Sequence, residues 1–179
     1  MRGKTGVRSA EEWATERYSE AMIVHRLDQS TSGILVIAKN KEVHEALQKQ
    51  FISRTVKKSY VALLEGIIDT QQGEILLPLK LDYDNRPRQM VAPDGRAAQT
   101  LFEVEGYSEG RTRIRFYPIT GRTHQLRVHA AHCEGLGTPI VGDDIYGHSA
   151  ERLMLHAETI EFTHPTTGKH IRLETKAEF

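Results

Sequence analysis

One carboxylate in this chain lies where a folded protein can use it for chemistry. Asp28 follows Arg26 by two positions within the polar run 25–33 (HRLDQSTSG), and the apolar stretch Ile34–Ala38 comes directly after that run. The stretch predicts a strand buried on both faces, so a rigid element would hold the carboxylate while its loop keeps it accessible. A carboxylate held in this way can act as a nucleophile or as a base. An isolated loop aspartate is more often a solvated residue or a helix cap, so this interpretation needs support from the rest of the chain.

Three further segments bring basic, aromatic and turn-forming residues into a fixed order along the chain. They are residues 57–63 (KKSYVAL), 77–89 (LPLKLDYDNRPRQ) and 119–129 (ITGRTHQLRVH). Together with the run 25–33, they resemble the ordered motifs of the RluA-type pseudouridine synthases, enzymes that isomerise uridine in RNA. The resemblance extends from about Thr15 to the C-terminal strands through shorter matches at 139–143, 155–157 and 162–165.

The resemblance implies an isomerase with Asp28 as its catalytic carboxylate. The reaction breaks the bond between uracil N1 and C1′ and joins C5 to C1′, with no redox change, so no cofactor is expected. Asp28 would attack C1′, add to uracil C6 or remove a sugar proton, and the sequence does not choose among these routes. Arg127 would be the ion-pair partner that keeps Asp28 ionised and oriented. Tyr60 would stack on the uracil and could transfer a proton at C5.

The same resemblance assigns RNA contacts to three arginines. A uridine in structured RNA has to leave its stack before it can react, and Arg26 would fill the gap or contact the flipped nucleotide's phosphate. Arg86 and Arg122 would contact phosphates or base edges. On residue type alone, the alternatives are solvated charges for these arginines, an exposed helix residue for Arg127 and a half-buried strand residue for Tyr60.

Two other patterns point less clearly to function. Arginines alternate along the segment 111–115 and predict a strand with one basic face, which fits a solvent-facing surface better than an RNA track. Nine histidines invite a metal site, but there is no second cysteine and no His-Glu-x-x-His pattern. We expect no metal, and we expect His124 and His129 to contact backbone or RNA.

Composition sets outer limits on these hypotheses. A chain of 179 residues with 39% hydrophobic content fits one domain. Its single cysteine, Cys133, suits a reducing cytoplasm, and neither a membrane span nor a signal-peptide core at residues 1–6 is predicted. The 24 basic residues equal the 24 acidic ones, which argues against indiscriminate polyanion binding but does not exclude RNA.

Periodicity and capping signals predict the α+β class with a largely antiparallel sheet. Helices are expected over 9–18, 40–53 and 123–134, and strands over 34–38, 59–66, 98–107, 112–117, 153–162 and 170–174, with an irregular surface excursion over 73–95. The resemblance implies the mixed, mostly antiparallel sheet of the pseudouridine synthases, with flanking helices and Asp28 in a central cleft.

Members of the resembled family normally have a strand segment before the first helix, and this chain is expected to begin just after it. We therefore expect residues 1–179 to form one N-terminally short catalytic domain without an S4 module, whose sheet would have a bare edge. The segment 84–89 is most similar to the branch that modifies both 23S ribosomal RNA and a tRNA anticodon stem. The alternative is a non-catalytic RNA-binding module derived from this fold. A nucleosidase-like hydrolase fits poorly, because glycoside hydrolysis usually needs two carboxylates.

Overall fold

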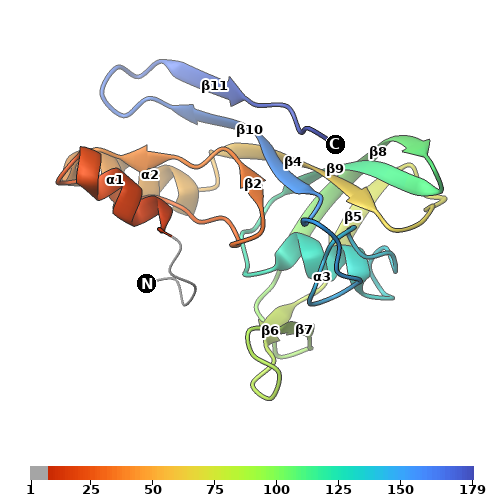
Figure 1. Cartoon of the computed structure of the whole chain (residues 1–179). Coiled ribbons are helices and arrows are strands. Elements are labelled where there is room, and N and C mark those ends of the chain that lie inside the picture. The colour runs from red at the N-terminus through yellow and green to blue at the C-terminus, as the bar shows by residue number, and fades with distance from the viewer. Residues whose placement is uncertain (1–7) are drawn as a thin grey trace.

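A seven-stranded sheet forms the centre of the structure, a computed structural model that describes residues 8–179 (Figure 1). Six strands follow in the order β11-β10-β4-β9-β8-β5 with every neighbouring pair antiparallel, and β2 pairs with β10 in parallel. The predicted α+β class with a mostly antiparallel sheet is confirmed. The strands are β2 (Ser32–Gly33), β4 (Lys57–Leu64), β5 (Gln72–Leu76), β8 (Gln99–Ser108), β9 (Arg111–Pro118), β10 (Leu155–Thr163) and β11 (His170–Glu174).

Within residues 8–179, three helices flank this sheet. They are α1 (Ala10–Arg17), α2 (Lys41–Ile52) and α3 (Gln125–Ala131). Figure 1 shows α1 and α2 together at one end of the molecule and α3 beneath the other half of the sheet. The first two begin at their predicted caps, because the Ser9 side chain accepts the Glu12 amide at 3.1 Å and the Asn40 side chain accepts the Val43 amide at 2.9 Å.

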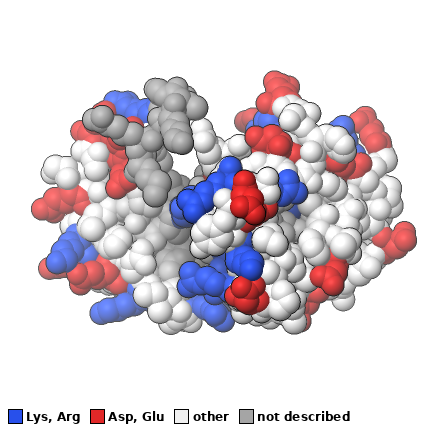
Figure 2. All heavy atoms as spheres, turned by 90° about the horizontal axis from the view of Figure 1, so that it is seen from below, with Lys and Arg blue, Asp and Glu red and all other residues white. Residues whose placement is uncertain are grey.

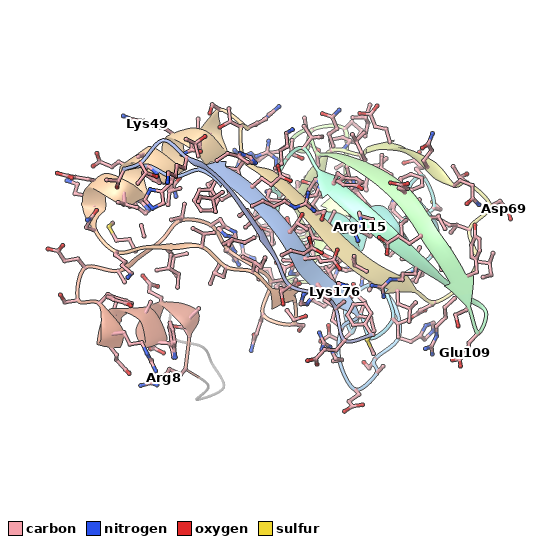
Figure 3. The ribbon with its side chains drawn as sticks, turned by 90° about the horizontal axis from the view of Figure 1, so that it is seen from above. Arg8, Lys49, Asp69, Glu109, Arg115 and Lys176 are labelled. Atoms are coloured by element: carbon pink, nitrogen blue, oxygen red, sulfur yellow. The ribbon has the colours of Figure 1, made fainter. Side chains whose placement is uncertain are left out.

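The main core lies against one face of β9. Thr112, Ile114 and Phe116 are fully buried on that face, as the alternation along this strand predicts. The intervening arginines lie on the opposite face, where Figure 3 shows Arg115 in the middle of the sheet. Burial of each large apolar side chain here stabilises the fold by about 1.5–3 kcal/mol, so the central strands are rigid supports for what lies at their ends.

The prediction of a doubly buried strand over Ile34–Ala38 is wrong. Only β3 (Ile37–Ala38) is a strand, and it pairs with β1 (Met22–Ile23) in a separate two-stranded sheet. The residues before it are only partly buried. The reason is that the chain between β1 and β3 forms a long loop. This loop reaches the main sheet, where its short strand β2 pairs with β10.

The segment 73–95 is more regular than predicted. It contains the last four residues of β5, which is an edge strand of the main sheet, and a separate two-stranded arm made of β6 (Leu79–Leu81) and β7 (Gln89–Val91). This arm projects from the body of the molecule (Figure 1). Its strands have only three residues each, too short for a period of two to stand out among the surrounding Gly, Pro and Asp residues.

Among residues 8–179, no helix is both long enough and apolar enough to cross a lipid bilayer. Residues 1–6, for which no signal-peptide core is predicted, lie outside the described part of the chain.

Candidate active site

A cleft of about 260 Å³ opens where the loop after β1 meets the ends of β4 and β9 and the start of α3. We call it the central cleft. It is lined by residues of segments 25–31 and 118–126 together with Phe51, Lys58, Tyr60 and Leu155. Four of the six predicted site residues lie in its wall: Arg26, Asp28, Tyr60 and Arg122.

A glycine attaches the loop that carries Asp28 to strand β10. Gly33 pairs with Ala157 of β10 and has a φ of 111°. A Cβ atom at this position would lie 2.2 Å from the Ala157 carbonyl oxygen. Only glycine fits this approach. Because Ala157 also pairs with Tyr60 of β4, one row across the sheet connects the loop to the tyrosine.

A histidine joins the two ends of the same loop. The Nε2 atom of His25 accepts the Val36 amide at 3.0 Å, and the ring stacks on Phe51 with a centroid distance of 5.0 Å. Burial, and then the positive charge of Lys58, lower the pKa of His25 to about 4. The ring is therefore neutral near pH 7, which leaves Nε2 free to accept this hydrogen bond.

The carboxylate of Asp28 faces the cleft without a fixed partner. It is the only acidic side chain among the described residues of the cleft wall, and within residues 8–179 its carboxylate has no hydrogen bond and no ion pair shorter than 4 Å. Burial, and then the charge of Asp28, raise the pKa of Tyr60 to about 12. The site therefore combines an unengaged carboxylate with a protonated phenol that lies within its electrostatic reach.

The expected ion pair between Asp28 and Arg127 is absent from the described structure. Arg127 donates through Nε and Nη2 to Asp143 at 2.8 and 2.6 Å, and through Nη2 to Asp144 at 3.1 Å. Asp143 also accepts two backbone amides, from Ile145 and Tyr146, at 3.0 Å each. This carboxylate is fixed and fully buried, so it takes the bidentate side of the guanidinium.

Arg127 still acts on Asp28 through space. Burial alone would lower the pKa of Arg127. The pKa is nevertheless raised, because Arg127 is hydrogen-bonded to Asp143 and lies near the negative charges of Asp143 and Asp28. The arginine lies on α3 behind the cleft wall and keeps a positive charge near the carboxylate without touching it. Asp143 was not singled out from the sequence, although a buried arginine requires a carboxylate partner and the matched segment 139–143 ends in this residue.

Lys58 is a further residue that the sequence analysis missed. It lies two positions before Tyr60 on β4, so both side chains share one face of the strand, and both line the cleft. Burial lowers the pKa of its ammonium group. Its position in the KKSY motif and the period of two are the signals that would have found it.

Histidines bind protein groups in this region. His129 contacts the Leu77 carbonyl at 3.3 Å, and burial lowers its pKa to about 4. His124 contacts the Tyr146 hydroxyl at 2.9 Å rather than a backbone group, and that hydroxyl also accepts the Gln89 amide of β7 at 2.7 Å. Residues 8–179 contain no group of three or more His, Cys, Asp and Glu side chains that could hold a metal ion.

The predicted RNA contacts are not all in one place. Arg122 lines the cleft, and its Nε donates to the Ala97 carbonyl at 3.0 Å. Arg86 lies outside the cleft in the turn of the β6–β7 arm, 5.1 Å from the exposed Tyr83 ring. On the opposite face of the sheet, Arg113 and Arg115 pair with Glu105, and Arg115 also pairs with Glu158. These paired charges favour the solvent-facing interpretation of that strand.

Known proteins resemble the chain along most of its length. Residues 3–132 match the family model described as RNA pseudouridylate synthase. The dual-specificity RNA pseudouridine synthase RluA of Vibrio parahaemolyticus is 47% identical over 161 residues, which cover 84% of this chain and 63% of the relative. RluA of Haemophilus ducreyi is 42% identical over 174 residues, covering 92% and 77% of the two chains.

Solved structures give the same result for the fold. Human RNA pseudouridylate synthase domain containing 1 superimposes with a TM-score of 0.81 at 29% identity, over 94% of this chain and 74% of the human chain. The chain spans 63% and 61% of the length of the relatives from Vibrio parahaemolyticus and Vibrio cholerae.

Proposed function

Because the chain belongs to the RNA pseudouridylate synthase family, we propose that it isomerises uridine to pseudouridine in structured RNA. Residues 1–179 would act as a single catalytic domain in the cytoplasm, without a metal ion or a cofactor. The rearrangement needs none, because the C1′–N1 bond breaks, a C1′–C5 bond forms, and the proton lost from C5 is balanced by one gained at N1.

The observation that carries this proposal is the unengaged Asp28 carboxylate opposite Tyr60 in the central cleft. A cleft of about 260 Å³ suits one extruded nucleotide rather than a duplex. The carboxylate is free to attack C1′, to add to C6 or to take a sugar proton. All three routes need Asp28 ionised, and Arg127 is close enough for its charge to interact with that of Asp28.

We assign the other cleft residues by what their positions support. Tyr60 offers an aromatic face to the base, and its phenol stays protonated at neutral pH. Arg127 acts from behind the wall, held by Asp143. At the cleft wall, Arg26 and Arg122 are in place to contact the flipped nucleotide and its phosphate. Arg86, on the projecting arm, would reach RNA outside the cleft.

We further propose that the substrates are ribosomal RNA and tRNA. Support comes from the relatives, whose names describe dual-specificity RNA pseudouridine synthases. The segment 84–89, which is similar to that branch, lies in the turn of the projecting arm, where a bound RNA would be accessible to it.

An isomerisation assay tests the activity directly. The parent chain and its Asp28→Asn variant are incubated with uridine-labelled 23S ribosomal RNA and bulk tRNA transcripts, and pseudouridine and free uracil are quantified. Pseudouridine from the parent alone is the expected result. RNA binding by both proteins without product would favour the non-catalytic RNA-binding module, and release of free uracil would favour a hydrolase.

A further inference from the structure

A second hollow adjoins the central cleft. It encloses about 460 Å³ and is lined by residues of segments 51–58 and 118–122 together with Arg96; we call it the side groove. The two hollows share six lining residues: Phe51, Lys58, Pro118, Thr120, Gly121 and Arg122. A chain that enters the cleft with one unit can therefore continue past Arg122 into the side groove.

The charges of the side groove are all of one sign. It is lined by four cations: Arg54, Lys58, Arg96 and Arg122. Among the described residues, no acidic side chain lines the groove. Within residues 8–179, none of these four cations takes part in an ion pair. Burial, and then the positive charges of Arg96 and Arg54, lower the pKa of Arg122. Figure 2 shows several Lys and Arg side chains gathered near the middle of the face seen from below, with a few Asp and Glu side chains beside them.

The backbone of Arg54 is held in a conformation that favours glycine. Arg54 follows α2 with a φ of 58°. Its amide donates to Phe51 at 3.3 Å and the Thr55 amide donates to Gln50 at 3.1 Å, which is the Schellman arrangement that ends helices. Glycine adopts this conformation without strain and arginine does not. An arginine at this position indicates a use for its side chain.

Arg96 is also fixed through its backbone. Its amide donates to the Leu79 carbonyl at 2.8 Å, and its carbonyl accepts the Leu79 amide at 3.0 Å. The preceding Gly95 has no room for a Cβ atom, which would lie 2.8 Å from the Leu79 nitrogen. The cations of the groove therefore extend from anchored backbone.

Apolar side chains accompany these charges. Ile52 is 77% exposed and Ile119 is 38% exposed, and both line the side groove. Unpaired arginines beside exposed apolar surface match a nucleic-acid strand, which offers phosphates to the cations and the faces of sugars and bases to the apolar groups.

We propose that the side groove binds the backbone of the single-stranded nucleotides next to the uridine in the central cleft, with Arg54 and Arg96 as its phosphate ligands. This proposal rests on RNA being the ligand of the cleft. A single strand is favoured over a duplex because the groove is continuous with a cleft that admits only one nucleotide. Arg122, at the junction, would contact the phosphate between the two sites.

The test removes both phosphate ligands while respecting the backbone. Arg54→Gly keeps the left-handed conformation, and Arg96→Gln keeps side-chain length and polarity. The double variant, made in the Asp28→Asn background so that the RNA is not altered, is titrated with a tRNA anticodon stem-loop transcript. We expect Kd to rise on the order of tenfold or more, and the slope of log Kd against log salt to fall by about 1.4, or roughly 0.7 for each phosphate.

A matched control loses the same charge elsewhere. Arg111→Gln with Lys169→Gln removes two exposed cations that do not line either hollow, one at the start of β9 and one just before β11. We expect this variant to bind RNA as the parent does. Thermal unfolding completes the control, because Arg54→Gly should leave the melting temperature unchanged or raise it.

Neutral methylphosphonate linkages locate the contact on the RNA. Placed one at a time beside the target uridine, such a linkage should weaken binding to the parent at one or two positions, and should have no further effect on the double variant. Loss at linkages within the paired stem instead would overturn the single-strand assignment.

The outcomes separate this proposal from the proposed activity. Unchanged affinity of the double variant, or a loss no larger than that of the control, overturns the side-groove proposal even if the parent makes pseudouridine. Weaker binding of the double variant with no pseudouridine from the parent supports the groove and rejects only the catalytic proposal. A parent chain that does not bind the stem-loop would overturn the groove proposal.

Discussion

At the scale of single residues, Arg127 shows how a charge can serve a site that it does not touch. Its guanidinium is almost fully buried, and its bidentate side is occupied by Asp143. The carboxylate that would otherwise compete for it, Asp28, stays free in the cleft. Because Asp143 holds the Arg127 guanidinium, the Asp28 carboxylate keeps both of its oxygens available.

Replacing Asp143 should cost much more stability than replacing its neighbour. Asp143→Asn leaves the Arg127 charge buried without its bidentate partner, a loss of about 3–5 kcal/mol. The side chain of Asp144 is 63% exposed, and loss of such a pair costs about 0–1 kcal/mol. Urea unfolding of Asp143→Asn and Asp144→Asn measures both values, and equal destabilisation would contradict the assignment of Asp143 as the anchor.

At the scale of elements, the loop between β1 and β3 is held at two points. His25 closes its base by accepting the Val36 amide, and Gly33 docks its far side against Ala157. His25 also lines the central cleft, whereas Gly33 does not, and the two points share no residue. The two fastenings can therefore be tested one at a time.

Stability should fall in mild acid because of His25. Its folded-state pKa of about 4 lies below the ordinary histidine value of 6.5, so the neutral ring stabilises the fold above pH 6.5. This contribution is lost as the pH falls from 6.5 towards 4. At pH 5 the loss is about 2 kcal/mol, with a similar loss from His129, whose pKa is also about 4.

Urea unfolding at pH 7 and pH 5 measures this loss. His25→Gln keeps an acceptor for the Val36 amide and does not titrate, so it should remove about half of the parent's pH-dependent loss. A variant with the same pH dependence as the parent would show that His25 is not the titrating group.

Gly33→Ala should detach the loop from β10. The added Cβ atom would lie 2.2 Å from a backbone oxygen, so the loop has to move and the Asp28 carboxylate moves with it. We expect a loss of about 1–3 kcal/mol of stability and loss of isomerisation activity. Gly110→Ala is the control, since this glycine also has a positive φ, 74°, but open space around it; an equal loss of activity there would reject the docking argument.

The elements that could be predicted from the sequence are those specified by local signals. Ser9 and Asn40 mark helix starts, and alternation marks β9, because caps and periods act within a few residues. The stretch Ile34–Ala38 led to a wrong prediction, because an apolar run does not reveal what it packs against. Here its Val36 packs against side chains of α2, and the stretch is not covered on both faces as a strand of the main sheet would be.

Prediction of the site from the sequence had the same limit, because local patterns do not specify tertiary contacts. The ordered motifs identified Asp28, Tyr60 and Arg122, which all line one cleft in the structure. Periodicity alone could not have identified them. Spacing could not tell which of several carboxylates would pair with Arg127, because that choice depends on tertiary distance and on the backbone amides around Asp143.

At the scale of the whole molecule, the arginines of two faces differ in whether they are paired with carboxylates. On the face that Figure 3 shows, Arg115 is paired with Glu105 and with the buried Glu158. The cations of the cleft and the side groove have no such partners within residues 8–179. A chain with no net charge can thus present a basic surface to RNA and a neutral one elsewhere.

This division predicts opposite effects for arginines on the two faces. Arg115→Gln leaves Glu158 buried without its partner and should cost about 2 kcal/mol or more of stability, while the Kd for RNA stays within about twofold of the parent. Arg54→Gly should do the reverse. Unfolding and RNA titration of both variants check the contrast, and a large loss of RNA affinity in Arg115→Gln would contradict it.

The docking of β2 on β10 also fixes the order in which the site can form. Ser32 and His156, whose side chains meet at 2.8 Å, are 124 positions apart in the chain. During synthesis from the N-terminus, Asp28 leaves the ribosome well before the strand that positions its loop, because β10 begins only at Leu155. A nascent chain arrested before residue 155 would contain every cleft residue except Leu155 and still lack a docked loop. The cleft would therefore be complete only after β10 had been synthesised and β2 had docked on it.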